Sequence, residues 1–319
     1  MFTRRIAIAT GLTAALAHPG LAAGNFQSFV AGVYAEAGAA GIRRDVLDAA
    51  FAGVVPNQSV IDKDRRQAEF SMTWTRYRGL VISDKRIANG RAAIAQNRDL
   101  FARVESRYGV AANVIAGIWG LESSFGTTQG DYKVIESLAT LAWEGRRAAF
   151  FRTELIAALK ILNNGDIAAA RMLGSYAGAM GQPQFMPTSY LRLAVDFDGD
   201  GRRDIWNSKA DVLGSIANYL AKSGWRAGET WGQPVSIPAG VPAAGRDSKR
   251  SLAEWARLGV KPVSGRWSAP GETAAALLAP DGAGGETFMV FNNFAAIRRY
   301  NPSDFYAIAV GLIGDWVMS

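Results

Sequence analysis

The sequence predicts a mainly α-helical protein of the α+β class, with a small β-rich insertion in its C-terminal third. Apolar residues recur at three- and four-residue steps over most of the chain, as at Phe26, Phe29 and Val33, and this spacing is typical of helices. Prolines and glycines gather instead in residues 232–290, between short apolar runs that are typical of strands. With 319 residues and 49% hydrophobic content, the chain can bury a full core, as one large domain or two.

The apolar runs 274–278 and 286–291 flank the glycine-rich segment 281–285, and this arrangement predicts a hairpin. Residues 291–319 then return to helix, with Pro302 expected in the first turn because proline is tolerated there. The apolar face of this C-terminal helix would consist of Phe305, Ile308, Ala309 and Leu312.

The first 23 residues have the pattern of a secretory signal peptide. A basic segment, 1–5, precedes an apolar stretch, 6–17, that is too short for a stable membrane anchor, and the small residues at 20–23 offer a cleavage site. A buried N-terminal helix is the alternative. The sequence leaves Sec and twin-arginine export open, although the Ile-Ala-Ile after Arg5 fits the twin-arginine pattern poorly.

The chain that follows the signal peptide contains neither histidine nor cysteine. Removing residues 1–23 takes away His18, the one histidine, together with Arg4, Arg5 and no acid, so the net charge falls from +7 to +5. This composition excludes a Ser-His-Asp triad, a cysteine nucleophile, a thiolate or imidazole zinc site, a disulfide framework and a lipid-modified cysteine. Catalysis must then use Asp, Glu, Lys, Tyr, Ser or a hard metal ion bound by oxygen.

Several classes of partner are not expected. No stretch after the signal peptide is long and apolar enough to span a membrane, and no basic stripe with interleaved aromatic residues suggests a nucleic acid. No repeat of 20–50 residues is present, and no organic cofactor is expected. The modest basic excess suits an anionic polymer or surface, although solubility alone would also explain it.

Residues 112–123 predict a helix that carries one acid, Glu122, near its end. Its main apolar line consists of Val114, Ile118, Leu121 and Phe125. Glu122 shares the adjacent line with Ile115 and Trp119, in the last turn before Gly126. Desolvation and the negative end of the helix dipole would both raise the pKa of Glu122, as a general acid requires. The alternative is an ordinary helix end whose glutamate points to water.

An acidic loop at residues 196–207 has the spacing of a calcium-binding loop. Oxygen ligands at positions one, three, five and nine would come from Asp196, Asp198, Asp200 and Asp204. Gly201 falls at position six, where such loops turn sharply, and Arg202 can offer its backbone carbonyl at position seven. Position twelve departs from the pattern, because Asn207 replaces the glutamate that normally closes the site.

Asp211 could close a longer loop in place of Asn207. Its alternative role is structural, because Ser208 and Asp211 form a capping-box pattern at the start of a helix expected over 209–222. One carboxylate cannot be fully committed to both roles. A solvated acidic turn remains the alternative to calcium.

Three separated stretches resemble the B-type lytic murein transglycosylases (glycoside hydrolase family 103), which cut the glycan of bacterial peptidoglycan. They are GIWGLESSFG (117–126), SYAGAMGQPQFMPTSY (175–190) and DFDGDGRRDIW (196–206). Supporting matches lie at 138–151, 214–225 and 298–310. The resemblance runs from about residue 26 to the C-terminus and is specific because the motifs occur together.

The resemblance implies a lysozyme-like helical catalytic core over 109–231, which carries the EF-hand-like loop. A helical region over 24–108 would precede the core, a small β-rich subdomain would occupy 232–290, and a helix within 291–319 would return to the core. It further implies peptidoglycan glycan strands as the partner, the periplasm of a Gram-negative bacterium as the location, and a monomer.

The resemblance also assigns roles to individual residues. The family's single catalytic acid falls on Glu122. Its substrate-binding residues fall on Ser175, Gln184, Arg146, Arg147, Asn301 and Tyr306. Its calcium ligands fall on Asp196, Asp198, Asp200, the Arg202 carbonyl and Asp211, which favours Asp211 over Asn207 as the closing ligand.

Each substrate-binding assignment has a structural alternative. Ser175 could cap its own segment, and Gln184 could hydrogen-bond to the backbone of its loop. Arg146 and Arg147 could lie on a solvated helical face; we expect one of them to contact substrate and the other to pack. Asn301 could cap a helix that starts at Pro302.

A single acid suits a lyase rather than a hydrolase, because glycoside hydrolysis usually needs two carboxylates. The reaction that the resemblance implies breaks the bond between N-acetylmuramic acid (MurNAc) and N-acetylglucosamine (GlcNAc) and closes a 1,6-anhydro ring, with Glu122 acting as acid and then as base. The alternatives are a muramidase in which Asp131 assists a water molecule, and a non-catalytic glycan-binding protein. Endo or exo cleavage and the preferred stem peptide are left open.

Overall fold

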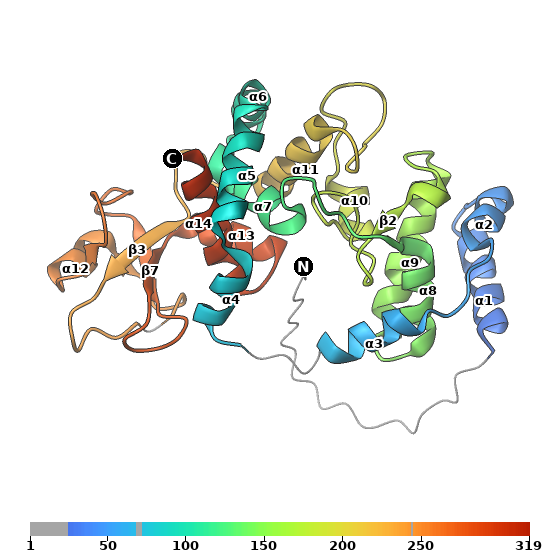
Figure 1. Ribbon diagram of the computed structural model, residues 1–319, viewed down its shortest axis with the longest axis horizontal. Helices are drawn as coiled ribbons and strands as arrows, with labels where there is room; N and C mark the ends of the chain where they lie inside the picture. The colour runs from blue at the N-terminus through green and yellow to red at the C-terminus, as the bar shows by residue number, and fades with distance from the viewer. Residues whose placement is uncertain (1–24, 68–71, 244) are drawn as a thin grey trace. The chain divides into compact units, whose positions relative to one another are not determined.

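The computed structural model describes residues 25–67, 72–243 and 245–319 (Figure 1). The predicted signal peptide therefore lies outside the described residues. The described residues form fourteen α-helices, one short 3₁₀ helix and seven strands, of which five make the larger sheet. This confirms the predicted class, a mainly helical protein with a small β-rich part. None of these helices is long and apolar enough to cross a membrane.

The chain divides into two compact units. The loop unit, named for the acidic loop, comprises residues 25–67 and 126–215 among those described. The glutamate unit, named for Glu122, comprises 72–125 and 216–319, apart from residue 244.

The loop unit is built around two packed helices, α8 and α9. Its elements are α1 (Phe26–Ala39), α2 (Arg44–Phe51), α3 (Gln58–Gln67), β1 (Tyr132–Lys133), α8 (Val134–Glu144), α9 (Ala148–Asn163), η1 (Ala169–Arg171), β2 (Leu173–Gly174) and α10 (Pro187–Leu193). A buried acid on α9, Glu154, accepts hydrogen bonds from the Thr188 backbone N–H at 2.9 Å and from Thr188 Oγ1 at 2.8 Å. This pair fixes the start of α10, where Pro187 occupies the first turn.

The glutamate unit has the pair α7 and α14 at its centre, with α4 and α5 packed against α14. Its helices are α4 (Trp74–Val81), α5 (Asp84–Ala95), α6 (Arg98–Tyr108), α7 (Ala112–Ser123), α12 (Leu252–Arg257), α13 (Asn292–Tyr300) and α14 (Asp304–Met318). Helices α7 and α14 approach each other closely because α7 has glycine, Gly117, at the point of contact. A Cβ atom on Gly117 would lie 2.1 Å from the Val310 carbonyl oxygen, so no larger residue fits.

Two helix predictions match the structure residue for residue. Helix α7 spans Ala112–Ser123, and α11 spans Lys209–Lys222, beginning in the loop unit and ending in the glutamate unit. The predicted start of the last helix is wrong. Helix α14 begins at Asp304 with Ser303 as its N-cap, because the Ser303 hydroxyl accepts from the Tyr306 backbone N–H at 3.3 Å. Pro302 therefore precedes the helix.

The five-stranded sheet lies wholly within the region predicted to be β-rich. Its strands are β3 (Gly232–Ser236), β4 (Arg250–Ser251), β5 (Lys261–Pro262), β6 (Ala274–Leu278) and β7 (Thr287–Val290). They pair antiparallel in the order β4-β6-β7-β3-β5, and the predicted hairpin is β6 and β7. Helix α12 was not predicted; its Trp255 packs in the core under the sheet and donates Nε1–H to the Ala275 carbonyl at 2.9 Å.

Candidate active site

Glu122 lies in the last turn of α7 and is buried, with 4% of its surface exposed. Tyr306, from α14, donates its phenolic O–H to Glu122 Oε1 at 2.8 Å. The alternative of a glutamate that points to water is therefore wrong. A buried carboxylate without a partner would be costly, and this tyrosine supplies one.

Tyr77, on α4, also lies close to Glu122 and was not found by the sequence analysis. Burial raises the pKa of the Tyr77 phenol, the negative charge of Glu122 raises it further, and the Arg86 guanidinium acts in the opposite direction. Tyr77 is 7% exposed, so these charges interact through little solvent. No motif or spacing in the sequence connects residue 77 to residue 122, so only the fold could reveal this neighbour.

Asn301 belongs to the same unit as Glu122 and is 3% exposed. Its Oδ1 accepts from the Ser303 backbone N–H at 3.1 Å, so Asn301 shapes the turn before α14 and is not the N-cap of that helix.

The neighbouring Tyr300 stacks on Tyr306 with ring centroids 6.4 Å apart, and the ring centroid of Tyr219 lies 4.5 Å from that of Tyr300. Tyr219 and Tyr300 were not among the predicted site residues.

Ser175 and Gln184 lie in the loop unit, and both bond to nearby backbone. Ser175 Oγ accepts from the N–H of Ala177 at 3.3 Å and of Ala179 at 3.0 Å. Gln184 Nε2 donates to the carbonyls of Gln129 at 2.9 Å and of Gly181 at 2.8 Å. The structural alternatives are thus both observed. They leave the Ser175 hydroxyl proton available as a donor.

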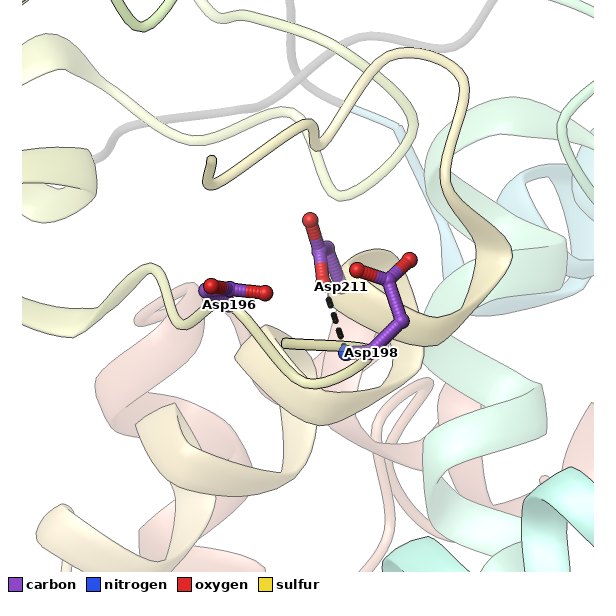
Figure 2. A group of neighbouring side chains, drawn as sticks. All are labelled: Asp196, Asp198 and Asp211. Atoms are coloured by element: carbon purple, nitrogen blue, oxygen red, sulfur yellow. Dashed lines mark hydrogen bonds between the residues drawn. The ribbon is translucent and has the colours of Figure 1, made fainter. Parts of the chain in front are cut away.

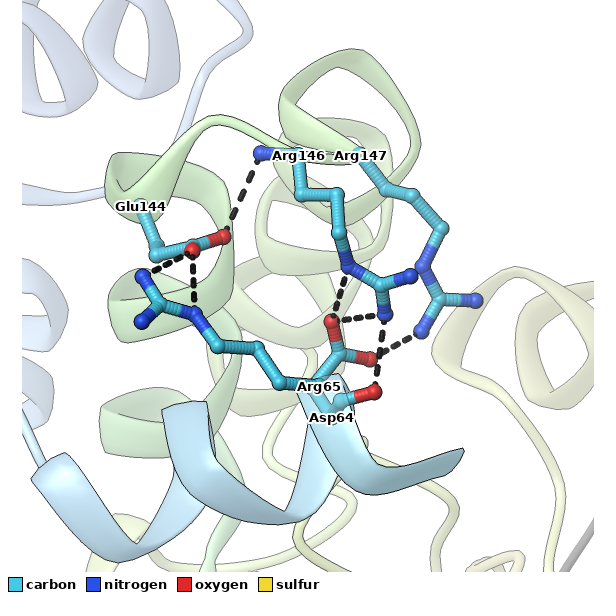
Figure 3. Close-up of polar contacts among 5 residues, drawn as sticks. All are labelled: Asp64, Arg65, Glu144, Arg146 and Arg147. Atoms are coloured by element: carbon cyan, nitrogen blue, oxygen red, sulfur yellow. Dashed lines mark hydrogen bonds and ion pairs between the residues drawn. The ribbon is translucent and has the colours of Figure 1, made fainter. Parts of the chain in front are cut away.

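Arg146 and Arg147 lie in the turn between α8 and α9 and converge on one carboxylate, Asp64 of α3 (Figure 3). Arg146 donates Nε–H to Asp64 Oδ2 at 2.9 Å and Nη2–H to both that carboxylate and the Asp64 carbonyl. Arg147 donates Nη2–H to Asp64 Oδ1. Asp64 is 2% exposed, whereas the Arg146 and Arg147 side chains keep 37% and 33% of their surface exposed. The alternative of a solvated helical face is therefore only partly right, because both arginines reach solvent but are bonded to a buried carboxylate.

The two arginines are not equivalent. Arg147 lies over the ring of Phe151 at 4.7 Å, and its Nε is buried without a hydrogen-bond partner in the described part of the chain. Beside the pair, Arg65 bonds to Glu144 at 2.9 Å (Figure 3). Three arginines and two carboxylates leave this cluster with a net charge of +1, so it can attract an anionic group.

In the acidic loop, carboxylate oxygens of Asp196, Asp198 and Asp211 lie within 4.8 Å of one another (Figure 2). Asp211 is fully buried and comes from the first turn of α11, whereas the other two are exposed on the loop. Hard oxygen ligands that converge in this way suit calcium.

Asp211 binds the loop more than it caps the helix. Its carboxylate accepts from the backbone N–H of Phe197 at 2.7 Å and of Asp204 at 2.8 Å. Ser208 caps α11 by accepting from the Asp211 N–H at 3.2 Å. Burial is the main cause that raises the pKa of Asp211, to about 6.

The other acidic-loop side chains bond to groups within the loop itself. Asn207 Nδ2 donates to the Asp204 carboxylate at 3.0 Å, so Asn207 does not close the group of three acids. Asp200 Oδ1 accepts from the Arg202 N–H at 2.8 Å and lies outside that group.

The sequence over residues 25–315 matches the family described as the transglycosylase SLT domain. The chain belongs to this family. As a transglycosylase of the SLT family, it is a lytic enzyme that acts on peptidoglycan, and the resemblance to the B-type members is confirmed.

Individual relatives agree with this assignment. The membrane-bound lytic murein transglycosylase B of Escherichia coli K12 is 36% identical over 251 residues, which are 76% of this chain and 67% of the relative. SltB3 of Pseudomonas aeruginosa, solved in complex with NAG-anhNAM-pentapeptide, is 45% identical with a TM-score of 0.88, covering 92% of this chain and 80% of that one. Slt35 of Escherichia coli, solved in complex with calcium, is 32% identical with a TM-score of 0.76, covering 92% and 93%.

Proposed function

We propose that this transglycosylase cleaves the β-1,4 bond between MurNAc and GlcNAc without water and releases 1,6-anhydromuramyl ends, with Glu122 as acid and then base. The observation that carries the proposal is the buried Glu122 carboxyl bound by Tyr306 in the helix that the family motif marks. The anhydro sugar named in the SltB3 complex supports the same product class.

The reaction needs one group that gives a proton and takes one back. Protonated Glu122 donates to the glycosidic oxygen as the bond to the muramyl C1 breaks, and the acetamido oxygen of the substrate stabilises the cation. Ionised Glu122 then removes the proton from the C6 hydroxyl, whose oxygen bonds to C1. Glu122 is protonated again at the end, so no water is consumed.

The surroundings of Glu122 suit both halves of this cycle. Burial on α7 favours the neutral acid, because an ionised carboxylate loses its hydration there. The Tyr306 hydrogen bond favours the ionised form, because a carboxylate accepts more strongly than a carboxylic acid. The two opposing effects keep both protonation states accessible in one turnover.

The remaining predicted residues would bind the glycan. Ser175 can donate its hydroxyl proton to an acetamido or ring oxygen, and Gln184 can accept through Oε1, since both amide N–H groups are committed. Arg146 and Arg147 present the positive cluster to an anionic group of the substrate. Asn301 and Tyr306 would also contact the sugar.

We further propose a structural calcium ion in the acidic loop. Its ligands would be Asp196, Asp198, Asp200, the Arg202 carbonyl and Asp211. The convergence of Asp196, Asp198 and Asp211 supports this set, since a cation between carboxylates that lie this near one another would relieve their mutual repulsion. The calcium named in the Slt35 complex supports the same metal. The ion would hold the loop to α11 and takes no part in the reaction.

The proposal places the enzyme in the periplasm as a monomer, exported by the segment 1–23. Its parts would be a helical region at 24–108, the catalytic core at 109–231, the β-rich subdomain at 232–290 and the returning C-terminal helix at 291–319.

Mass spectrometry of digested sacculi tests the reaction. Anhydromuramyl ends, lighter than reducing ends by one water, are expected from the wild type, and Glu122→Gln should release them at least about a hundredfold more slowly while keeping its fold. If the wild type instead forms reducing ends and the Asp131→Asn variant does not, the result would support the muramidase. Binding to sacculi without any product would support the glycan-binding protein.

A further inference from the structure

The backbone directly after Glu122 is held in an unusual conformation. Ser124 has φ of 50° and Phe125 has φ of 59°, so two consecutive non-glycine residues adopt the left-handed region. Their N–H groups close the end of α7, because Ser124 N donates to Gly120 O at 3.0 Å and Phe125 N donates to Trp119 O at 3.2 Å. Glycine is the usual residue at such a helix end.

The side chains at these two positions are both used. Arg86, on α5, donates Nη2–H to Ser124 Oγ at 3.3 Å, a contact that glycine could not make. The Phe125 ring is 7% exposed and lies 5.6 Å from the ring of Trp119 in an edge-on arrangement. The strained conformation of Ser124 and Phe125 therefore occurs at two residues whose side chains each make a specific contact.

The Phe125 ring occupies a slot that exists because two helices carry glycine beneath it. A Cβ atom on Gly120 would lie 2.5 Å from the ring, and so would a Cβ atom on Gly90. Gly90 and Arg86 are four residues apart, so they share one face of α5. The same face of α5 thus packs against the Phe125 ring at Gly90 and hydrogen-bonds to Ser124 through Arg86.

We propose that the turn formed by Ser124 and Phe125 positions Glu122. Helix ends fray, and Glu122 is the last residue but one of α7. Its carboxyl would therefore vary in position unless the turn that follows were fixed. Proton transfer to one substrate oxygen and then from another tolerates little displacement of the carboxyl. Ser124, Phe125 and Arg86 act through Glu122 and are positioning residues. This inference rests on the proposed role of Glu122.

Ser124→Gly separates positioning from stability, because the two effects have opposite signs. Glycine accepts the left-handed conformation without strain, so the melting temperature should stay equal or rise. Loss of the Arg86 contact should lower kcat by at least about tenfold, with KM changed by less than about twofold. The pH dependence of kcat should also shift, since the surroundings of Glu122 change. A folded Ser124→Gly enzyme with wild-type kcat and pH profile overturns the inference.

Gly120→Ala tests the slot independently, since the three nearest atoms to its added Cβ all belong to the Phe125 ring. Its matched control is Gly79→Ala on α4, where a Cβ would meet nothing within 4 Å. We expect Gly120→Ala to lower kcat, the control to leave it unchanged, and Phe125→Leu to restore part of the activity of Gly120→Ala. Arg86→Gln and Ser124→Gly are also combined in a double variant. If their separate losses of kcat simply add, the two residues do not act through a shared contact.

Glu122→Gln is measured in parallel. If that variant stays active, the proposed function fails. If it is inactive and the turn variants behave like wild type, the positioning inference alone fails.

Discussion

Glu122 and Asp211 are both buried carboxylates near a helix terminus, but their surroundings differ in two ways. Asp211 lies in the first turn of α11, where the positive end of the helix dipole favours a charged acid, and the backbone N–H groups of Phe197, Asp198 and Asp204 bond to it. Glu122 lies at the other end of its helix, where the dipole favours the neutral acid, and a tyrosine hydroxyl bonds to it. Asp211 thus has donors that oppose the effect of its burial, which raises its pKa to about 6, and this suits the proposed ion. The surroundings of Glu122 suit the proposed proton exchange.

The largest expected effect concerns Glu122. Glu122→Gln keeps the shape and a hydrogen-bonding amide but cannot transfer a proton, so turnover should fall by roughly a hundredfold to ten-thousandfold. The release of anhydromuramyl products from sacculi measures this, with a thermal melt to show that the fold is kept. If Glu122 were only structural, the melting temperature would drop while the specific activity of the folded fraction stayed normal.

Asp211→Asn should affect stability rather than chemistry. The variant should lose the stabilisation that the proposed calcium ion would give the wild type, which is about 2.7 kcal/mol at a calcium concentration a hundred times its Kd. Thermal melts with calcium and with chelator measure it. Asp204→Asn is the matched control in the same loop, because the Asp204 carboxylate bonds to Asn207 and is not one of the proposed ligands. Identical melts of the wild type with calcium and with chelator would refute the calcium site.

The sequence could predict the local features of both regions but not their partners. Periodicity placed α7 and α11 at their observed bounds, and residue spacing marked the loop acids, because these signals lie within one segment. Tyr77 and Asp64 were missed, because each meets its partner through tertiary packing and neither belongs to a motif. The left-handed turn after Glu122 was missed for the same reason, since nothing local distinguishes its Ser and Phe from ordinary residues.

Tyr306→Phe should have a smaller effect than loss of Glu122. It removes a hydrogen bond to a carboxylate, and such bonds to charged groups contribute about 1.5–3 kcal/mol. The ionised form of Glu122 loses support, so kcat should fall by at least about tenfold and the pH profile should move to higher pH. A pH–rate profile of Tyr306→Phe beside the wild type measures both changes. An unshifted profile would mean that the hydroxyl serves the substrate and not the acid.

The smallest effect concerns the pH dependence of the calcium site. In the calcium-free protein, burial raises the pKa of Asp211 from 3.8 to about 6. Between these two values the folded state holds a proton that the unfolded state releases, so this group makes the calcium-free protein less stable as pH rises through that window and adds no further change above it. Calcium needs the ionised carboxylate, so below about pH 6 its affinity should fall by up to about tenfold per pH unit.

The gap between the melting temperatures with and without calcium should therefore be constant above about pH 6 and close on acidification. Asp211→Asn supplies the control, since it should show no gap at any pH. A gap that persists unchanged to pH 4.5 would show that Asp211 stays ionised without the metal, and its bonds from the N–H groups of Phe197 and Asp204 would then outweigh its burial. In that case a buried acid at a helix N-terminus would be charged before the ion arrives, which would widen the contrast with Glu122.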